Sequence, residues 1–233
     1  MKTIGLIGGM SVESTAIYYR LINEDVRSRL GGHHSAKLIL WSVDFAEIEA
    51  MQRAAAWDQA GAALADAAQR LEGAGAEAIV IAANTMHIVA DAVAGAVRVP
   101  LLHIADATAA AIKRTACQRP LLLATRYTME HDFYRGHLKK HHGIDAVVPD
   151  EAGRTAVHDI IFRELVKGVV NPASKQKFLD VTATARHGGA DGVIFGCTEI
   201  GMLLSQADLS EPCFDTAVLH AKAAVDFALS DAP

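Results

Sequence analysis

The sequence predicts an α/β fold made of two similar halves, and three observations support this prediction. Short apolar runs alternate with helix-length amphipathic segments, the pattern of strand and helix units around parallel sheets. One segment recurs without a gap in the second half of the chain. The 233 residues suffice for two small lobes with buried cores. We therefore expect two pseudo-symmetric lobes, each with a mainly parallel sheet flanked by helices.

The expected strands are short apolar runs that end in small or polar residues. Between them lie amphipathic helices such as residues 58–72, whose apolar stripe has the spacing of an ordinary core-facing helix. The run at 4–10 is typical of a buried strand rather than a signal peptide, because it is short and rich in glycine. The expected strands are 3–8, 37–43, 78–83, 100–104, 120–125, 145–148, 192–196 and 212–214.

The repeated segment is the strongest sign of two related halves. Residues 75–85 align with residues 189–199 through a glycine, an alanine, an acid, an apolar strand and a polar loop. A weaker similarity pairs residues 4–11 with residues 121–128. Each copy of the longer repeat is expected to carry a helix end into a strand and then into a loop.

The two halves predict domain boundaries and a place for a binding site. The first lobe is expected to contain residues 1–105 plus 214–233, and the second residues 106–213. The final helix should fold back on the first half. Ligands of open parallel sheets bind beyond the carboxyl ends of the strands, so we expect the active site in the cleft between the lobes. The loops expected to line it are 8–11, 83–87, 124–128 and 196–199.

Composition and charge exclude several classes of function. The net charge is −5 and no basic stripe is present, so the electrostatic signature of a nucleic-acid-binding protein is missing. No stretch is long and apolar enough to span a bilayer. The three cysteines lie far apart, which favours a reducing cytoplasm and free thiols over a disulfide framework. Chemistry on a small molecule is therefore expected.

Cys197 is the candidate catalytic residue. A lone cysteine is more often a buried small side chain, but this one follows an apolar strand and precedes an expected helix start. Helix N-termini lower thiol pKa values, which would favour the reactive thiolate. The neighbouring Glu199 is expected to orient side chains or to bind a substrate ammonium rather than to accept the thiol proton. Cys117 and Cys213 have no such setting and are interpreted as structural.

Polar residues in the other loops have two interpretations. Asn84 and Thr85 follow one expected strand, and Thr125, Tyr127 and Thr128 follow another. Helix capping alone would explain several of them, whereas their loop positions favour substrate contact.

Glycine and histidine patterns argue against cofactors and metals. The N-terminal glycines lack the G-x-G-x-x-G spacing of a dinucleotide site, although Gly8 and Gly9 would suit either a tight turn or a carboxylate-binding loop. His87 is expected to be an ordinary packed or partly solvated histidine. The pairs 33–34 and 141–142 lack ligand spacing and are expected to be solvated, so no metal site is predicted.

Several stretches of the chain together resemble a known family over nearly its whole length. The sequence is similar to the aspartate/glutamate racemase superfamily, and most closely to its bacterial broad-specificity amino-acid racemase branch. The matching stretches are residues 1–11, 42–45, 84–87, 102–108, 125–129, 132–135 and 195–200.

The resemblance implies an amino-acid racemase that needs no pyridoxal phosphate or other cofactor and forms a homodimer. In the family mechanism one cysteine from each lobe faces the substrate α-carbon, and the second of these matches Cys197. The substrate-binding residues that we expect are Met10, Arg53, Asn84, Thr85, Thr125, Tyr127, Thr128 and Thr198.

The sequence departs from the family at the first-lobe cysteine, where it has Ala83. A methyl group cannot abstract or donate a proton, so a symmetric pair of cysteines is excluded. Three interpretations remain. The enzyme racemises with a water or the Thr85 hydroxyl as the second proton carrier, or it works on one face only, as a single-cysteine decarboxylase does, or it binds amino acids without catalysis.

The substrate is not identified by the sequence. Arg53 would suit the distal carboxylate of aspartate or glutamate, with Lys167 a weaker candidate, but a solvated helix arginine has the same pattern. Met10, Met86 and Met202 would suit a larger apolar substrate. The physiological role and the source of the second proton are likewise left open.

Overall fold

Parallel strand pairing organises the chain into two α/β units in the computed structural model, which describes residues 1–230. One unit contains residues 1–103 and, within the described part of the chain, 220–230, and the other contains Ile104–Leu219. The second boundary therefore falls inside α10 (Thr216–Ala228) rather than at residue 214. The last three residues of the predicted first lobe, 231–233, lie outside the described part of the chain.

The first unit contains a three-stranded parallel sheet in the order β2-β1-β3. Its strands are β1 (Ile4–Gly8), β2 (Leu38–Ser42) and β3 (Ala78–Ile81). Both pairings start at Ile4, so the carboxyl ends of all three strands meet at one edge of the sheet. The strands β1 and β3 are fully buried, which explains why their sequences are continuous apolar runs.

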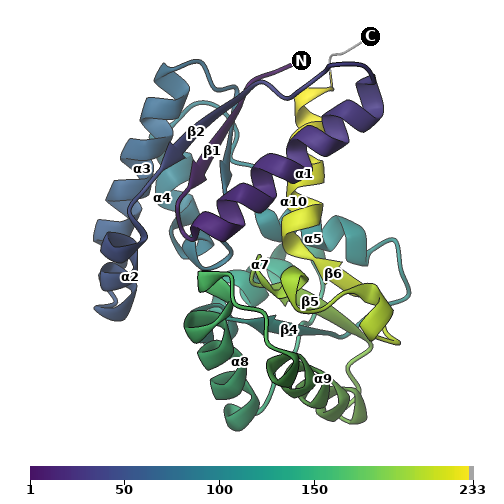
Figure 1. Ribbon diagram of the computed structural model, residues 1–233. Coiled ribbons are helices and arrows are strands. Elements are labelled where there is room, and N and C mark those ends of the chain that lie inside the picture. Colours follow the sequence, from purple (N-terminus) through teal and green to yellow (C-terminus); the bar gives the residue numbers. More distant parts are fainter. Residues whose placement is uncertain (231–233) are drawn as a thin grey trace. The chain divides into compact units, whose positions relative to one another are not determined.

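Helices cover both faces of this sheet, with α3 and α4 on one side and α1 on the other (Figure 1). The predicted apolar stripe of α3 is confirmed, because Ala60, Leu64, Ala67, Ala68 and Leu71 are buried, while its sixth member, Ala63, is half-buried. The helices and 3-10 turns of this unit are α1 (Val12–Leu30), α2 (Phe45–Arg53), α3 (Trp57–Gly73), η1 (Thr85–Val89) and α4 (Ala90–Ala96), followed by most of α10.

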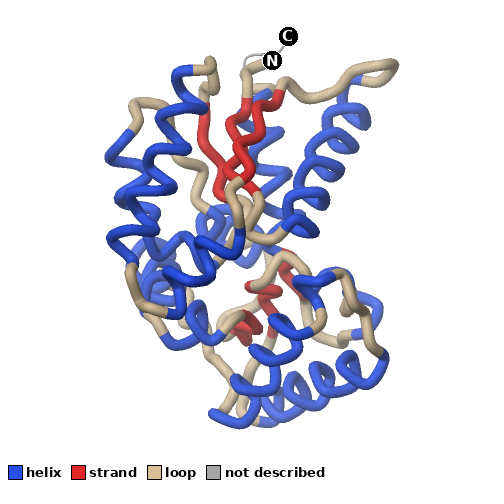
Figure 2. Tube along the Cα trace, turned by 60° about the vertical axis from the view of Figure 1, so that its left-hand side comes forward, coloured by secondary structure: helices blue, strands red, loops and turns tan. Residues whose placement is uncertain are grey.

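The second unit repeats the arrangement with strands in the order β4-β5-β6. These are β4 (Pro120–Ala124), β5 (Gly192–Gly196) and β6 (Cys213–Asp215), again all parallel. In Figure 2 the red strands of each sheet lie among blue helices. The helices and turns of this unit are α5 (Ile104–Ile112), α6 (Arg126–Glu130), α7 (Asp132–His142), α8 (Glu151–Arg163), η2 (Leu165–Lys167), α9 (Pro172–His187), η3 (Ile200–Met202) and η4 (Gln206–Asp208).

Two predicted strands are wrong. Residues 100–104 and 145–148 each contribute one isolated bridge, Leu101 to Ile79 and Val147 to Leu121. Pro100 has no N–H for a longer ladder, and helix α5 begins already at Ile104. Phe214 pairs with Ile194 in the second sheet and the Thr216 hydroxyl donates to the Phe195 carbonyl, which ties the start of α10 to the second unit.

The internal repeat predicted from the sequence has the same backbone in both units. Gly75 and Gly189 follow α3 and α9 with φ of 99° and 90°, a conformation that favours glycine. The next N–H in each copy returns to the preceding helix, from Ala76 to Leu71 and from Ala190 to Ala185. Each copy of the repeat then continues into a buried strand, so the repeat consists of a helix end followed by a strand.

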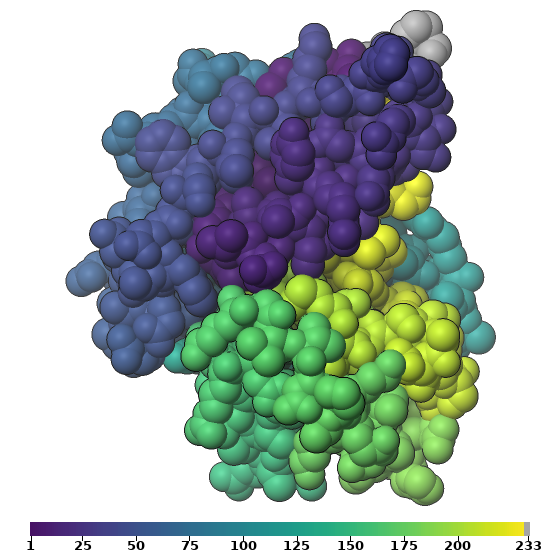
Figure 3. Space-filling model, viewed as in Figure 1, coloured from purple at the N-terminus to yellow at the C-terminus, as the bar shows by residue number. Residues whose placement is uncertain are grey.

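The surface of the first unit includes the outer side of α1, drawn in purple along the face shown in Figure 3. Val12 and Tyr19 on this helix and Leu40 and Trp41 on the edge strand β2 are exposed large apolar side chains. Within residues 1–230 no helix combines the length and the apolarity needed to cross a membrane.

Candidate active site

The loop after β5 presents Cys197 at the carboxyl end of the strand. A Cβ atom at Gly196 would lie 2.5 Å from Leu122 Cδ1, so glycine leaves space for the buried Leu122 side chain just before the thiol. The Cys197 carbonyl accepts a hydrogen bond from Ile200 N at 3.1 Å, which turns the chain into η3. Cys197 itself is only 7% exposed.

Hydrogen bonds tie the Cys197 thiol to a buried carboxylate. The thiol donates to Glu199 Oε2 at 2.9 Å, and the Thr198 hydroxyl donates to the same oxygen at 2.7 Å. Glu199 is 2% exposed. The sequence analysis did not expect Glu199 to accept the thiol proton, and the structure shows that its carboxylate accepts the hydrogen bond of the thiol. The two-residue spacing of Cys197 and Glu199 within a tight turn could have indicated this hydrogen bond from the sequence.

The environment raises the pKa of the Cys197 thiol well above its ordinary value. Burial is the largest cause, and the charge of Glu199 and its hydrogen bond to the thiol act in the same direction. The backbone N–H groups of Thr198 and Glu199 lower the pKa but do not outweigh these effects. The predicted lowering by a helix N-terminus is therefore wrong, since only the three-residue η3 follows the loop.

The other cysteines lie in different surroundings. Cys117 donates to Asp191 Oδ1 at 3.0 Å, and burial raises the pKa of this thiol to about 12. Asp191 also accepts backbone N–H groups of Gln118 and Arg119, so it stabilises that loop. Burial and Asp215 likewise raise the pKa of Cys213.

The loop that follows β4 lies beside Cys197 in the same sheet. Thr125 and Cys197 directly follow Ala124 and Gly196, which are paired across the two strands. Thr125 caps α6 by accepting Thr128 N at 3.4 Å, and the two hydroxyl oxygens lie 3.2 Å apart. Both threonines are buried, so capping explains part of their role.

Tyr127 in the same loop lies edge-on to His158 on α8, with ring centroids 6.0 Å apart. His158 Nδ1 accepts the backbone N–H of Arg126 at 3.2 Å, which fixes the proton of the neutral ring on Nε2. Burial and the Arg126 charge lower the pKa of His158. Sequence reasoning missed His158 because no local pattern links it to a loop 32 residues away.

The equivalent loop of the first unit carries Ala83 where the second carries Cys197. Ala83 lies eight residues after Gly75, as Cys197 does after Gly189. Ala83, Asn84 and Thr85 are all buried. Asn84 occupies the N-cap position of η1 without a side-chain capping bond, so local capping does not explain this residue.

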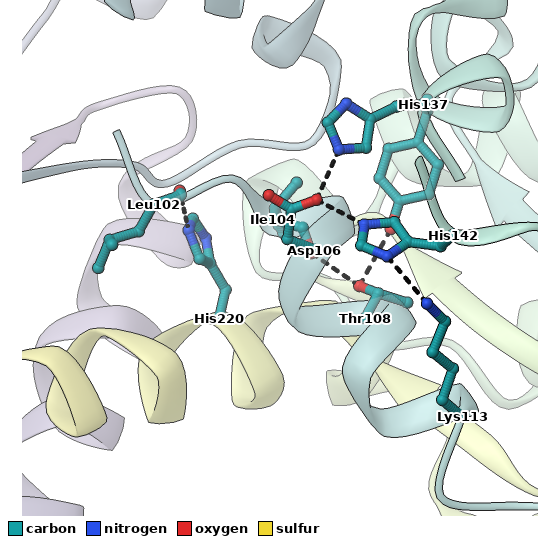
Figure 4. Close-up of polar contacts among 9 residues, drawn as sticks. Leu102, Ile104, Asp106, Thr108, Lys113, His137, His142 and His220 are labelled. Carbon is teal, nitrogen blue, oxygen red and sulfur yellow. Dashed lines mark hydrogen bonds and ion pairs between the residues drawn. The ribbon is translucent and has the colours of Figure 1, made fainter. Parts of the chain in front are cut away.

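His87 is attached to this loop. Its Nδ1 lies 2.8 Å from the Ala83 carbonyl oxygen, so Nδ1 carries a proton and Nε2 is the basic nitrogen of the neutral ring. The ring is buried and lies edge-on to His103, with centroids 4.6 Å apart. Nearby, His220 contacts the Leu102 carbonyl at 2.6 Å (Figure 4). His87 is therefore packed, as the sequence predicted.

The Gly8-Gly9 loop is a tight turn with its own hydrogen bonds. Gly9 has φ of 89°, and a Cβ atom there would lie 2.2 Å from the Val43 carbonyl oxygen. Its N–H donates to Thr15 Oγ1 at 2.8 Å, which favours the turn interpretation over a carboxylate-binding loop. Met10 is buried in the core of this unit.

The side chains of Arg53 and Lys167 are exposed, unlike the buried residues of the loops. Arg53 ends α2 and pairs with Glu49 at 2.9 Å, with 68% of its side chain exposed. Lys167 lies in the short η2 turn of the second unit. These contacts fit the interpretation of Arg53 as a solvated helix arginine.

A histidine and aspartate cluster in the second unit contains metal-ligand types. Asp106 Oδ1 lies 2.6 Å from His137 Nε2 and 2.7 Å from His142 Nε2 (Figure 4). His142 is half-buried and bonded rather than solvated, which corrects the prediction for this residue. The Lys113 ammonium lies 3.4 Å from His142 Nδ1 and would oppose a cation. That the protein needs no metal stays a prediction.

The fold and the thiol loop define a class of protein. It has two α/β units with related strand-to-helix loops, and one of these loops carries a cysteine whose thiol is hydrogen-bonded to a carboxylate. Residues 7–224 match the family model of the Asp/Glu/hydantoin racemases. The chain belongs to this family, which identifies it as a racemase and therefore as an isomerase.

Individual relatives agree with this assignment. The chain is 26% identical over 173 residues to the broad-specificity amino-acid racemase RacX of Bacillus subtilis (strain 168), covering 72% of each protein. A crystal structure of a candidate Asp/Glu racemase from Yersinia pestis is 52% identical, with a TM-score of 0.91 over 98% of this chain and 100% of that chain. An aspartate racemase homologue from Pyrococcus horikoshii OT3 is 37% identical, with a TM-score of 0.85 over 98% of this chain and 99% of that chain.

Proposed function

We propose that this protein is a cofactor-independent amino-acid racemase in which Cys197 moves the α-proton. The observation that carries the proposal is the buried thiol at the carboxyl end of β5, hydrogen-bonded to a carboxylate within its own loop. The relatives support an amino acid as the substrate, since one is a broad-specificity amino-acid racemase and another an aspartate racemase homologue.

The chemistry requires a base beside the α-carbon and donors for the substrate carboxylate. Removal of the α-proton leaves an electron pair that spreads into the carboxylate, and hydrogen-bond donors stabilise the charge that develops there. The hydroxyls of Thr85 and Thr125, the Asn84 amide and the backbone N–H groups of the loops that contain them and Thr198 supply such donors, whereas the Thr198 hydroxyl already donates to Glu199. We assign them to substrate binding, together with Met10, Tyr127 and Thr128.

Because position 83 is an alanine, another group must deliver a proton to the face of the α-carbon opposite Cys197. In a racemase the proton must return on the face opposite the one from which it left, and a methyl group offers none. We propose that a water or the Thr85 hydroxyl carries this proton. Ala83 also favours one alternative, an enzyme that transfers a proton on one face only, as a single-cysteine decarboxylase would. A protein that only binds amino acids is the other alternative.

The substrate is proposed to be an amino acid of the aspartate or glutamate type. Arg53 would pair with a distal carboxylate only after leaving Glu49, so its contribution to specificity would be modest. Met10 and Met86 are buried in the core of the first unit, so their burial does not favour a larger apolar substrate. A homodimer in the cytoplasm remains our expectation, and light scattering of the purified chain tests the dimer.

The direct test uses single enantiomers of a panel of amino acids, including aspartate and glutamate, with no added pyridoxal phosphate or metal. We expect loss of optical activity with at least one substrate and none with Cys197→Ala. Binding without turnover would support the binding-protein alternative. Release of carbon dioxide from an arylmalonate-type substrate would support the decarboxylase.

A further inference from the structure

The Cys197 loop contains a thiol and a carboxylate in direct contact. We propose that Glu199 is the proton acceptor for the Cys197 thiol, so that the two side chains share one proton. The catalytic consequence rests on the proposed racemase function, whereas the shared proton does not. The contact of 2.9 Å between Sγ and Oε2 and the burial of both residues carry the inference.

The proton transfer balances within the pair. The S–H bond of Cys197 breaks, an O–H bond forms on Glu199 Oε2, and the negative charge moves from the carboxylate to the sulfur. The thiolate then takes the α-proton, and the electron pair of the broken C–H bond stays with the substrate, where it spreads from the α-carbon into the carboxylate. In the opposite direction Cys197 returns its proton to the α-carbon, and Glu199 restores the thiol. No oxidant, reductant or added co-reactant is needed.

Burial makes an internal acceptor necessary. Loss of the thiol proton to solvent would place a second negative charge beside the Glu199 carboxylate in a buried site, which is costly. Transfer to Glu199 instead leaves the pair with one negative charge while the thiolate forms, and uptake of the α-proton moves that charge to the substrate. Among the described residues, Glu199 is the charged group that acts on the Cys197 thiol. The loop itself therefore offers the route to the thiolate.

Thr198 holds the acceptor in place. Its hydroxyl donates to Glu199 Oε2 at 2.7 Å, so the oxygen that faces the thiol is fixed from a second direction. We assign Thr198 as the positioning residue of the pair.

The pair at Cys117 offers a matched control. Its thiol lies 3.0 Å from Asp191 Oδ1, but that carboxylate also accepts two backbone N–H groups and its pKa is lowered. Asp191 is thus a weak proton acceptor with a structural role. Two thiol and carboxylate contacts of similar length are therefore expected to differ in function.

Glu199→Gln separates a proton acceptor from a mere neighbouring charge. Removal of the charge lowers the pKa of the Cys197 thiol, because the carboxylate raises it in the native protein. If Glu199 were only a nearby charge, the variant would form thiolate more easily and would turn over as fast or faster. If Glu199 accepts the proton, turnover falls although the thiol has become more acidic. The two interpretations predict opposite signs.

The experiment measures racemisation and iodoacetamide alkylation of Cys197, resolved by peptide mass, in the full chain across neutral and alkaline pH. For the native protein we expect an alkylation rate that is nearly level around neutral pH, because the thiolate forms by internal transfer. For Glu199→Gln we expect alkylation to rise about tenfold per pH unit, and racemisation at neutral pH to fall by at least about 100-fold. Asp191→Asn should leave racemisation within about twofold of native.

Glu199→Asp keeps a carboxylate and should recover part of the lost racemisation, which separates proton transfer from a failure to fold. Native racemisation in Glu199→Gln at neutral pH would overturn the proposal, as would native alkylation that rises tenfold per unit through neutrality. Absence of racemisation in the native protein would refute the proposed function alone, because the alkylation profile still reports the shared proton.

Discussion

Restoring a thiol at position 83 tests how the first unit takes part in catalysis. Ala83 occupies the place in its loop that Cys197 occupies in the second loop, and it is 7% exposed. A positioned acid or base contributes about 10²–10⁴-fold to a rate. A thiol at position 83 would lack a carboxylate partner, however, since Thr85 stands where the second loop has Glu199. We therefore expect Ala83→Cys to raise inversion by about tenfold, below that range.

The double variant Ala83→Cys with Thr85→Glu rebuilds the complete thiol and carboxylate pair. It should raise inversion further than Ala83→Cys alone, provided that the larger side chains fit, since overpacking a buried site costs about 1–3 kcal/mol. Initial rates from both enantiomers by chiral chromatography, with thermal unfolding as the control for stability, provide the assay. If Ala83→Cys binds substrate normally but inverts it no faster, another residue already supplies the second proton and the reasoning fails.

The other predictions concern the thiol, cofactors and pH. Cys197→Ala should bind substrate without turnover, whereas the control Cys117→Ala should keep turnover. Racemisation by Cys197→Ala, measured by chiral chromatography, would exclude the thiol mechanism. Exhaustive chelation should leave activity intact, and loss that an added metal restores would contradict the expected metal independence. The folded protein lowers the pKa of His158, so the unfolded chain binds a proton at this histidine first as the pH falls. The contribution of His158 to stability is therefore complete above its ordinary pKa of about 6.5. It declines as the pH falls from there toward the lower pKa of the folded state. The fall in Tm between about pH 7.5 and 5.5 should shrink in His158→Asn, and an unchanged fall would contradict this assignment.

Much of the fold was readable because buried parallel strands have a simple pattern. The runs at β1, β4 and β5 are apolar throughout, and glycines with positive φ mark the two helix ends of the repeat. Residues near 101 and 147 were harder to predict, because an apolar run of four or five residues has the same composition whether it forms a strand or a single bridge. Only the presence of a pairing partner along the whole run separates the two.

The candidate site was predicted in position but not in electrostatics. The repeat indicated that Cys197 follows a strand, and the structure places it there. The direction of its pKa shift depends on burial and on which way the Glu199 carboxylate turns, neither of which sequence spacing encodes. Hydrogen bonds between distant segments, such as that from Arg126 to His158, were equally inaccessible.

The central claim, that one thiol serves one face of the α-carbon, is tested most directly by α-proton exchange in deuterated water. Each enantiomer of a substrate is incubated separately, and the loss of its α-hydrogen is compared with its inversion. We predict that one enantiomer exchanges faster than it inverts, that the other shows little exchange without inversion, and that Cys197→Ala abolishes the fast exchange. Equal behaviour of the two enantiomers, or fast exchange that persists in Cys197→Ala, would contradict the account.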